Sequence, residues 1–168
     1  MSNELMSGIS IRTELRPGDL GMIIHLHGRL YKEEYGYGVI FETYVARGLC
    51  EFYDQYDPRK DRVWICEDGQ RIVGFVLLMH REQDAAQLRY FILEPAYRGI
   101  GLGKHLMKLY MQHLREVGYR SSYLWTTHEL DAAASLYQRY GFVRVEEKES
   151  TAFGKKLFEQ RYELKEVK

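Results

Sequence analysis

One segment constrains the fold of this chain more than any other: an apolar strand-like run, a loop with three alternate glycines, and then an amphipathic helix. The loop reads Arg98-Gly99-Ile100-Gly101-Leu102-Gly103-Lys104. The first turn of a helix has backbone N–H groups without partners, and the positive end of the helix dipole lies there. Glycines let an anion approach those N–H groups, and Arg98 and Lys104 add positive charge beside them. The segment therefore predicts a binding site for a pyrophosphate.

Two well-known phosphate motifs do not fit this loop. A P-loop requires Gly-x-x-x-x-Gly-Lys-Ser/Thr, whereas Arg98 stands at the first glycine position and His105 follows the lysine. A dinucleotide fingerprint requires Gly-x-Gly-x-x-Gly near the start of a βαβ unit, whereas this loop reads Gly-x-Gly-x-Gly and follows four predicted strands. A glycine-rich turn without a ligand is disfavoured, because each glycine weakens a helix start by about 1 kcal/mol.

Hydrophobic periodicity and turn residues predict the element order β-α-α-β-β-β-α-β-α-β-β, an α/β fold with a mixed sheet and helices on both faces. The predicted strands are Ile9–Leu15, Val63–Glu67, Arg71–Met79, Gln87–Leu93, Ser121–Trp125, Phe142–Glu147 and Leu157–Leu164. The predicted helices are Asp19–Glu34 with Asp19 as its cap, Val39–Gln55, Leu102–Val117 and Asp131–Tyr140.

Two finer details of the sheet also follow from the pattern. Asp68-Gly69 is predicted to be the two-residue turn of a hairpin. Strict alternation along the fourth strand predicts two faces, with Leu88, Tyr90 and Ile92 on one and Arg89, Phe91 and Leu93 on the other.

Length, charge and cysteine content narrow the class of protein. The 168 residues suit a single domain, 1–168. Lys plus Arg equals Asp plus Glu, 24 each, so no general attraction to nucleic acid or to an anionic membrane is expected. There is no apolar run of about 20 residues and no secretory pattern in Met1–Ser10. Cys50 and Cys66 are interpreted as reduced, buried thiols, which favours a cytoplasmic location.

The glycine loop and a second motif together resemble the GNAT superfamily of acetyltransferases. The coenzyme A loop of that family reads Arg/Gln-x-x-Gly-x-Gly/Ala, which Arg98, Gly101 and Gly103 match in place. Downstream, Leu136 to Phe142 is similar to the family's Leu-Tyr-x-x-x-Gly-Phe, at a spacing that fits one helix and one strand. The resemblance implies a mixed, mostly antiparallel central sheet and transfer of an acetyl group from acetyl-CoA to an amine.

The resemblance also implies how the cofactor lies and which groups act on it. The pantetheine arm is expected between Leu88–Leu93 and Ser121–Trp125, paired with the backbone of Phe91, Ile92 and Leu93. A backbone N–H there would stabilise an oxyanion. The diphosphate is expected on Arg98, Gly99, Ile100, Gly101, Leu102, Gly103 and Lys104.

Tyr137, at the family's tyrosine position, is the candidate acid for the leaving thiolate. The other interpretation of Tyr137 is an aromatic ring that packs the helix onto the sheet. One position departs from the family: Leu130 replaces an asparagine that contacts the coenzyme arm, and Thr127 or His128 could take over that contact.

The general base is not defined by the pattern. Glu94 is more typical of a turn, while Glu33, Glu34, His25 and His27 fall in the helices that cover the acceptor site in the family. A chain of waters could serve instead. No metal is expected, because His25 and His27 are spaced i, i+2 and no cysteine or carboxylate cluster completes a ligand set.

The acceptor is left open between a small-molecule amine and a peptide amine. Six tyrosines crowd the first two helices and their flanks, as ordinary packing or as an aromatic slot for an amine: Tyr31, Tyr35, Tyr37, Tyr44, Tyr53 and Tyr56. An amino acid, a polyamine, an antibiotic and a protein N-terminus or lysine all fit, with a small molecule favoured. The alternative function is a non-catalytic acyl-CoA-binding sensor or interaction module, which the Leu130 departure keeps open.

A narrower likeness and an assembly hypothesis complete the sequence analysis. Arg16–Gly21, His27–Tyr31, Leu124–Thr126 and Phe153–Lys155 resemble the acetyltransferase half of MarR-type regulator fusions. DNA binding is not expected, because the segment before Ile9 is too short for a winged helix and the charge is balanced. Leu157–Leu164 is interpreted as an exposed sheet edge through which a homodimer could form.

Overall fold

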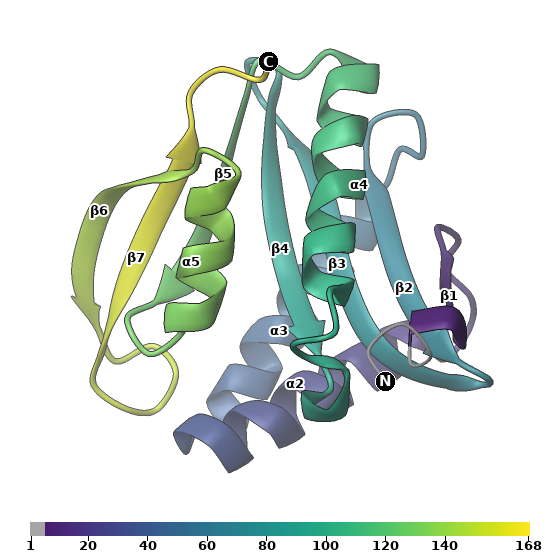
Figure 1. The fold of residues 1–168 in the computed structure, drawn as a ribbon. Helices are drawn as coiled ribbons and strands as arrows, with labels where there is room; N and C mark the ends of the chain where they lie inside the picture. The colour runs from purple at the N-terminus through teal and green to yellow at the C-terminus, as the bar shows by residue number, and fades with distance from the viewer. Residues whose placement is uncertain (1–5) are drawn as a thin grey trace.

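The computed structural model describes residues 6–168 and shows a seven-stranded sheet in the order β1-β2-β3-β4-β5-β7-β6 (Figure 1). All neighbouring strands are antiparallel except β4 and β5, which run parallel. The strands are β1 Ile9–Arg12, β2 Arg62–Asp68, β3 Arg71–Arg81, β4 Ala85–Leu93, β5 Ser121–Thr127, β6 Val143–Ser150 and β7 Leu157–Leu164. The predicted order of elements and the α/β class are confirmed.

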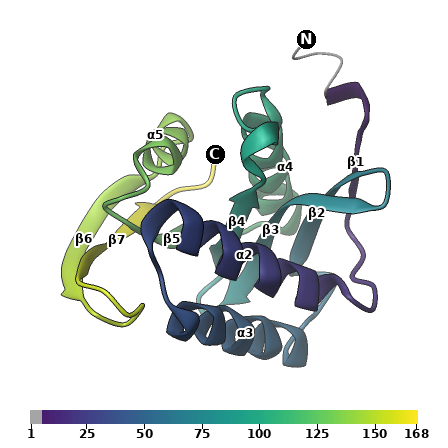
Figure 2. The ribbon, with the colours of Figure 1, turned by 90° about the horizontal axis from the view of Figure 1, so that it is seen from below.

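Helices cover both faces of the sheet, as Figure 2 shows from below. Helices α2 (Asp19–Tyr35) and α3 (Val39–Asp54) lie on one face, over a core that includes Ile23, Leu49 and Phe75. The other face carries α4 (Leu102–Val117) and α5 (Asp131–Arg139), over a second core that includes Leu106 and Tyr110. A short 3-10 turn, η1 (Pro95–Tyr97), leads from β4 to the glycine loop.

Strand β4 contains a bulge that the simple alternation pattern did not predict. Tyr90 has φ 56°, a left-handed value that is rare for a side chain of this size, and the register with β3 shifts opposite it. The bulge inverts the faces beyond it, so Phe91 and Leu93 join the same core as Leu88, while Ile92 belongs to the other. The predicted grouping of Leu88 with Ile92 was therefore wrong.

Two turns also differ from prediction. Gly18, with φ 96°, is the residue before α2, and Asp19 makes no side-chain cap. The Asp19 carboxylate instead accepts hydrogen bonds from the Arg12 guanidinium at 2.7 Å and from the Arg16 N–H at 2.6 Å, which ties β1 to the start of the helix. In the β2–β3 hairpin Asp68 still pairs with Arg71, so the turn is residues 69–70, one position later than predicted.

The closing strands and the cysteines bring two further corrections. Strand β7 lies between β5 and β6, so Leu157–Leu164 is not an edge, and the exposed edge at that end is β6. The edge interpretation was wrong because the last strand of the chain, β7, lies between β5 and the strand that precedes it in sequence, β6. Cys66 is buried, which raises the pKa of its thiol to about 12, whereas Cys50 is exposed rather than buried. No helix in residues 6–168 is long and apolar enough to cross a membrane.

Candidate active site

A groove opens where β4 and β5 stop pairing. Their register runs from Ala85 opposite Ser121 to Leu88 opposite Leu124 and goes no further. Beyond that point the two strands diverge, as the gap between them in Figure 1 indicates. We call the resulting space the β4–β5 groove; the residues that line it are Leu30, Tyr31, Glu34, Tyr35, Phe91, Ile92, Leu93, Arg98, Gly99, Gly101, Gly103, Lys104, Glu129, Leu130, Asp131, Ala132, Ala133, Ser135, Leu136 and Arg139. The backbone edge of residues 91–93 therefore faces a space and not a neighbouring strand.

The glycine loop closes one end of this groove. Gly99 and Gly101 have φ of 75° and 97°, so they are glycines because the backbone is left-handed there. The N–H of His105 donates to the Gly101 carbonyl at 3.0 Å, and the amides of residues 102–104 precede this first helical bond. A Cβ on Gly103 would meet Leu136 at 3.5 Å, an ordinary contact. The loop thus presents the open first turn of α4 to the groove.

The cations around the loop fall into two kinds. Both terminal nitrogens of Arg98 donate to the Glu34 carboxylate at 2.7 Å, and its Nε donates to the Leu93 carbonyl at 3.0 Å. The exposed side chains of Lys104 and Arg139 line the groove and have no ion pair or hydrogen bond within residues 6–168. Sequence reasoning missed Arg139, although its place in the last turn of α5, inside the second motif, was a signal.

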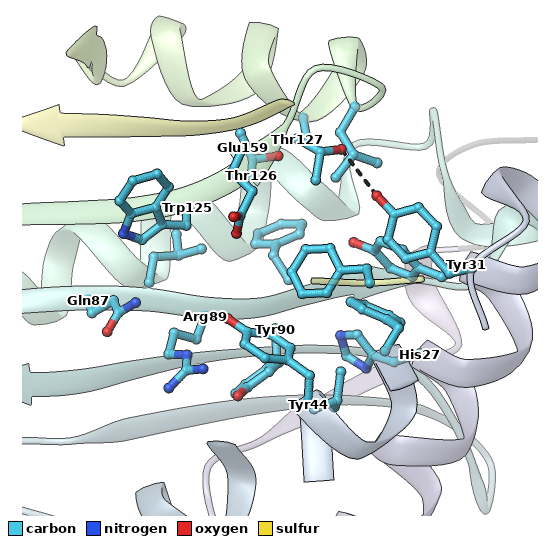
Figure 3. Close-up of a pocket in the computed structure, with 18 of the residues that line it drawn as sticks. His27, Tyr31, Tyr44, Gln87, Arg89, Tyr90, Trp125, Thr126, Thr127 and Glu159 are labelled. Carbon is cyan, nitrogen blue, oxygen red and sulfur yellow. Dashed lines mark hydrogen bonds between the residues drawn. The ribbon is translucent and has the colours of Figure 1, made fainter. Parts of the chain in front are cut away.

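A second space, the aromatic cavity, lies beside the groove, between the sheet and helices α2 and α3 (Figure 3). Its rings include Tyr31 and Phe41, whose centroids are 4.4 Å apart, with Tyr37, Tyr44 and Phe153 around them. The two spaces have four lining residues in common: Tyr31, Phe91, Leu130 and Ala133. Of the six tyrosines from the sequence, Tyr35 lines only the groove, and Tyr53 and Tyr56 line neither space.

Tyr137 lines the aromatic cavity from α5. Its ring meets Phe91 edge-on, with centroids 6.3 Å apart. Burial raises the pKa of the Tyr137 phenol well above its usual value, so the hydroxyl stays protonated at neutral pH. No residue within 6–168 forms a hydrogen bond with that hydroxyl. Tyr140, three residues on, instead donates to the Lys104 carbonyl at 2.9 Å and so ties α5 to the glycine loop.

The predicted base candidates mostly lie elsewhere. Glu94 is buried outside both spaces and is paired with Arg29 and, at 3.5 Å, with Arg71. Glu33 and His25 are exposed and line neither space, while Glu34 is held by Arg98 in the groove.

His27 does line the aromatic cavity. Its Nδ1 bonds to the Ile23 carbonyl at 2.8 Å, which assigns the proton to that nitrogen and leaves Nε2 as an acceptor. Burial lowers the pKa of His27 to about 4. The imidazole is therefore neutral at physiological pH and is a weak base.

Four polar residues of the aromatic cavity were missed from the sequence: Gln87, Arg89, Thr126 and Glu159. The hydroxyl oxygen of Thr126 is buried without a hydrogen-bond partner. Arg89 lies on β4 and Glu159 on β7, far apart along the chain, and only the sheet order brings them to one space. Motif spacing contains no signal for such a pair.

Thr127 and His128, the two residues considered as replacements for the family asparagine, differ in whether they line the site. Leu130 lines both spaces, and Thr127 lines the aromatic cavity, where its hydroxyl accepts from Tyr37 at 3.5 Å. His128 lines neither space, and its Nδ1 accepts the N–H of Phe158 at 3.1 Å. No group of three or more metal-ligating side chains occurs within residues 6–168.

A sheet opened between two parallel strands, with a glycine loop at the start of a helix and a tyrosine from α5 in the adjoining cavity, is suited to binding a carrier that bears phosphate groups. The family model of the acetyltransferase (GNAT) family matches residues 28–142. The chain belongs to this family, whose members use acetyl-CoA.

Relatives and solved structures agree with that assignment. The uncharacterized N-acetyltransferase YjgM of Escherichia coli is 34% identical over 107 residues, and the match covers 62% of this chain and 64% of that protein. A GNAT-family acetyltransferase from Staphylococcus aureus superposes with a TM-score of 0.75 at 18% identity, over 95% of this chain and 99% of the other. Spermidine N-acetyltransferase from Vibrio cholerae, solved with CoA and spermine, gives a TM-score of 0.66 at 22% identity, over 94% of this chain and 95% of the other. At these identities the two solved structures support the fold alone.

Proposed function

We propose that residues 1–168 act as one acetyltransferase domain that moves the acetyl group of acetyl-CoA to a primary amine of a small molecule or peptide. The observation that carries this proposal is the meeting of the β4–β5 groove with the aromatic cavity at Tyr31, Phe91, Leu130 and Ala133. A thioester in the groove and an amine in the cavity would be brought together at that junction, and such positioning supplies much of the rate of acyl transfer.

The groove offers each part of acetyl-CoA a suitable partner. The diphosphate would bind the amides of Gly99, Ile100, Gly101, Leu102, Gly103 and Lys104, with the charges of Lys104 and Arg139 beside them. The main role of Arg98 would be to connect the Glu34 carboxylate to the Leu93 carbonyl through its hydrogen bonds. The unpaired backbone edge of Phe91, Ile92 and Leu93 would bond the pantetheine amides and polarise the thioester carbonyl.

The transfer needs a neutral amine and a protonated leaving group. The substrate ammonium group first loses one proton; the neutral amine nitrogen then forms a bond to the acetyl carbon and the C–S bond breaks. From the ammonium form the products are therefore an N-acetyl amide, the coenzyme A thiol and that one released proton. Tyr137 would donate its phenolic proton to the departing sulfur and regain one from solvent. Glu159 would take the proton of the amine, because it is the carboxylate that lines the aromatic cavity in the described part of the chain.

The test uses purified protein with acetyl-CoA. Calorimetry measures acetyl-CoA binding, and release of coenzyme A thiol is followed across a panel of amines. We expect saturable binding and amine-dependent thiol release. Binding without release for every amine would favour the alternative, a non-catalytic acyl-CoA sensor, to which the Leu130 departure points.

Three finer predictions stay predictions: the likeness to the acetyltransferase half of MarR-type fusions, a cytoplasmic location and a homodimer. If a homodimer forms by sheet pairing at the β7 end, it would use β6 and not Leu157–Leu164. A monomeric sedimentation profile would contradict a dimer.

A further inference from the structure

Arg89 is a largely enclosed arginine whose guanidinium forms no hydrogen bond within residues 6–168. Its side chain is 11% exposed and its nearest carboxylate, Glu51, is 4.0 Å away. Glu51 is itself 46% exposed and lies closer to Arg81, at 3.3 Å. The guanidinium stacks over the Tyr90 ring at 4.7 Å, and no group within residues 6–168 accepts a hydrogen bond from it. Its five N–H donors are therefore free to bind an acceptor that enters the cavity.

Arg12 provides the contrast within the same chain. Its side chain has a similar exposure of 13%, yet it donates to Asp19 at 2.7 Å and to Glu67 at 2.8 Å. Burying a guanidinium without such partners is costly, and a structural role like that of Arg12 would supply them. Arg89 lacks them and lines the aromatic cavity, which indicates that the missing acceptor is a ligand.

Glu159 is the matching feature of opposite charge. It lines the same cavity from β7 and is half-buried, and its carboxylate has no ion pair or hydrogen bond within residues 6–168. Figure 3 shows Glu159 with Trp125 on one side of β4, and Arg89 with Tyr90 and Tyr44 on the other. The two charges do not pair with each other, so the cavity keeps a cationic end and an anionic end.

The orientation of these ends relative to the groove follows from the sheet register. Glu159 is opposite Thr127, whose carbonyl accepts the N–H of Leu130, a residue shared by the groove and the cavity. Arg89 precedes the shared residue Phe91 by two positions in β4, and its Nη2 is 2.7 Å from the position of a Cβ on Gly48 of α3, a helix that does not line the groove. The anionic end is therefore beside the groove and the cationic end is away from it.

We propose that the acceptor is an amine that also bears a carboxylate, such as a free amino acid. Arg89 binds the carboxylate and Glu159 holds the ammonium group near the junction with the groove. This inference rests on the proposed acetyl transfer and specifies its substrate class. A carboxylate fits better than a phosphate, because one negative charge on the ligand leaves Glu159 free to hold the amine, whereas a dianion would repel it.

The experiment compares matched acceptors at saturating acetyl-CoA, with thiol release as the readout. Each amino acid of a panel of α- and ω-amino acids is tested beside its carboxamide and its decarboxylated amine, with an aminoalkyl phosphate as the other anion. We expect kcat/KM to be higher for the acid than for its amide by roughly 10- to 100-fold, the range for losing hydrogen bonds between charged groups. Higher activity with the phosphate, or equal activity with amide and acid, would overturn the proposal.

Two variants assign the effect to Arg89. Arg89→Gln should lower kcat/KM for the acid by a similar factor and leave the amide unchanged. Glu51→Gln is the matched control, because it removes the carboxylate nearest to Arg89 while keeping the guanidinium. It should leave the preference for the acid intact. Loss of the preference in Glu51→Gln but not in Arg89→Gln would contradict a role for Arg89.

Failure of the transfer itself can be told apart from failure of this inference. If no amine releases thiol, calorimetry with N-acetyl amino acids and their amides, in the presence of coenzyme A, still measures carboxylate recognition. Tighter binding of the acids that is lost in Arg89→Gln would keep the inference although the proposed transfer had failed. If amines without a carboxylate release thiol equally well and Arg89→Gln has no effect, the inference about the acceptor is wrong, while the proposed acetyl transfer still holds.

Discussion

The β4–β5 groove and the aromatic cavity share four lining residues but are built in different ways. The groove is built mainly from one contiguous loop, residues 98–104, from α5 and the end of α2, and from the place where β4 and β5 part. The cavity gathers side chains from α2, α3, β4, β5, α5 and β7, with Phe153 from the loop between β6 and β7. On the proposed function, the backbone loop would bind a constant part of a cofactor and the scattered side chains a variable acceptor. That difference is why a motif identifies the first and not the second.

The largest expected effect separates chemistry from binding. Tyr137→Phe should lower kcat by about 100-fold, because the leaving thiolate loses its proton donor, with the acetyl-CoA Kd nearly unchanged. Stopped-flow or steady-state thiol release and calorimetry measure the two quantities. Tyr162→Phe is the control: Tyr162 is equally buried, 6.5 Å from Tyr137 by ring centroids, and lines neither space. An equal loss of kcat in both variants would mean that Tyr137 is a packing residue and not the proton donor.

The next largest effect is on the pH dependence of stability, and it comes from His27 in the wall of the aromatic cavity. The pKa of His27 is lowered by burial from 6.5 to about 4, among the rings of Tyr31, Phe41 and Tyr90. Because the folded-state pKa is below the unfolded one, the unfolded chain takes up the proton first as the pH falls. The stabilising contribution is complete above about pH 6.5 and is lost toward pH 4. We expect the free energy of unfolding to fall by about 2 kcal/mol from this residue between pH 7 and pH 5.

Denaturant titrations at the two pH values check this for the wild type and for His27→Gln. The variant should show a pH dependence smaller by that amount, while His105→Gln, at an exposed position, should not. Identical pH dependence in wild type and His27→Gln would mean that the imidazole is not held neutral by the cavity.

Two glycines of the groove should respond unequally to a methyl group. Gly101→Ala forces a side chain into a left-handed backbone at φ 97°, at a cost of about 1–2 kcal/mol, and should weaken acetyl-CoA binding roughly tenfold. Gly103→Ala meets only an ordinary contact at 3.5 Å and should change the acetyl-CoA Kd by no more than about twofold. Thermal unfolding and calorimetry measure both. If Gly103→Ala proved the worse of the two, the loop would bind its anion through a different set of amides.

The smallest expected effect comes from the exposed cations of the groove. Lys104→Ala and Arg139→Ala should each raise the KM for acetyl-CoA on the order of fivefold, since exposed charge contacts are worth about 1 kcal/mol or less. The effects should shrink as salt concentration rises. Lys108→Ala, an exposed lysine of α4 that does not line the groove, serves as the control. An unchanged KM in both groove variants would leave the backbone amides as the sole diphosphate ligands.

Local signals were enough for the element order and for the glycine loop. Residues 98–104 and 136–142 are contiguous, and their backbone geometry follows from glycine positions within them. The errors arose where the answer depends on a neighbour in space. The bulge at Tyr90 lies opposite a register shift in β3, and the edge position of β6 depends on which strand β7 pairs with.

The polar residues of the aromatic cavity show the same limit. Arg89 and Glu159 look like ordinary solvated charges of two strands when only the sequence is read. The role proposed for them can be inferred only when their burial and the absence of side-chain partners within residues 6–168 are known. Tyr137 was accessible from the sequence because it belongs to a motif, although its place at the cavity wall was not.

The short pairing between β4 and β5 has a mechanical consequence. Strands β1–β4 and strands β5–β7–β6 are joined across the middle of the sheet by four register pairs, Ala85–Ser121 to Leu88–Leu124. A carrier bound in the groove would take the place of the missing strand pairing between the two halves of the sheet. It would restrict their hinge motion relative to each other. Binding of the carrier would then reduce the motion of α5 and of the cavity wall. The pocket for the second substrate would become rigid only after the carrier is bound.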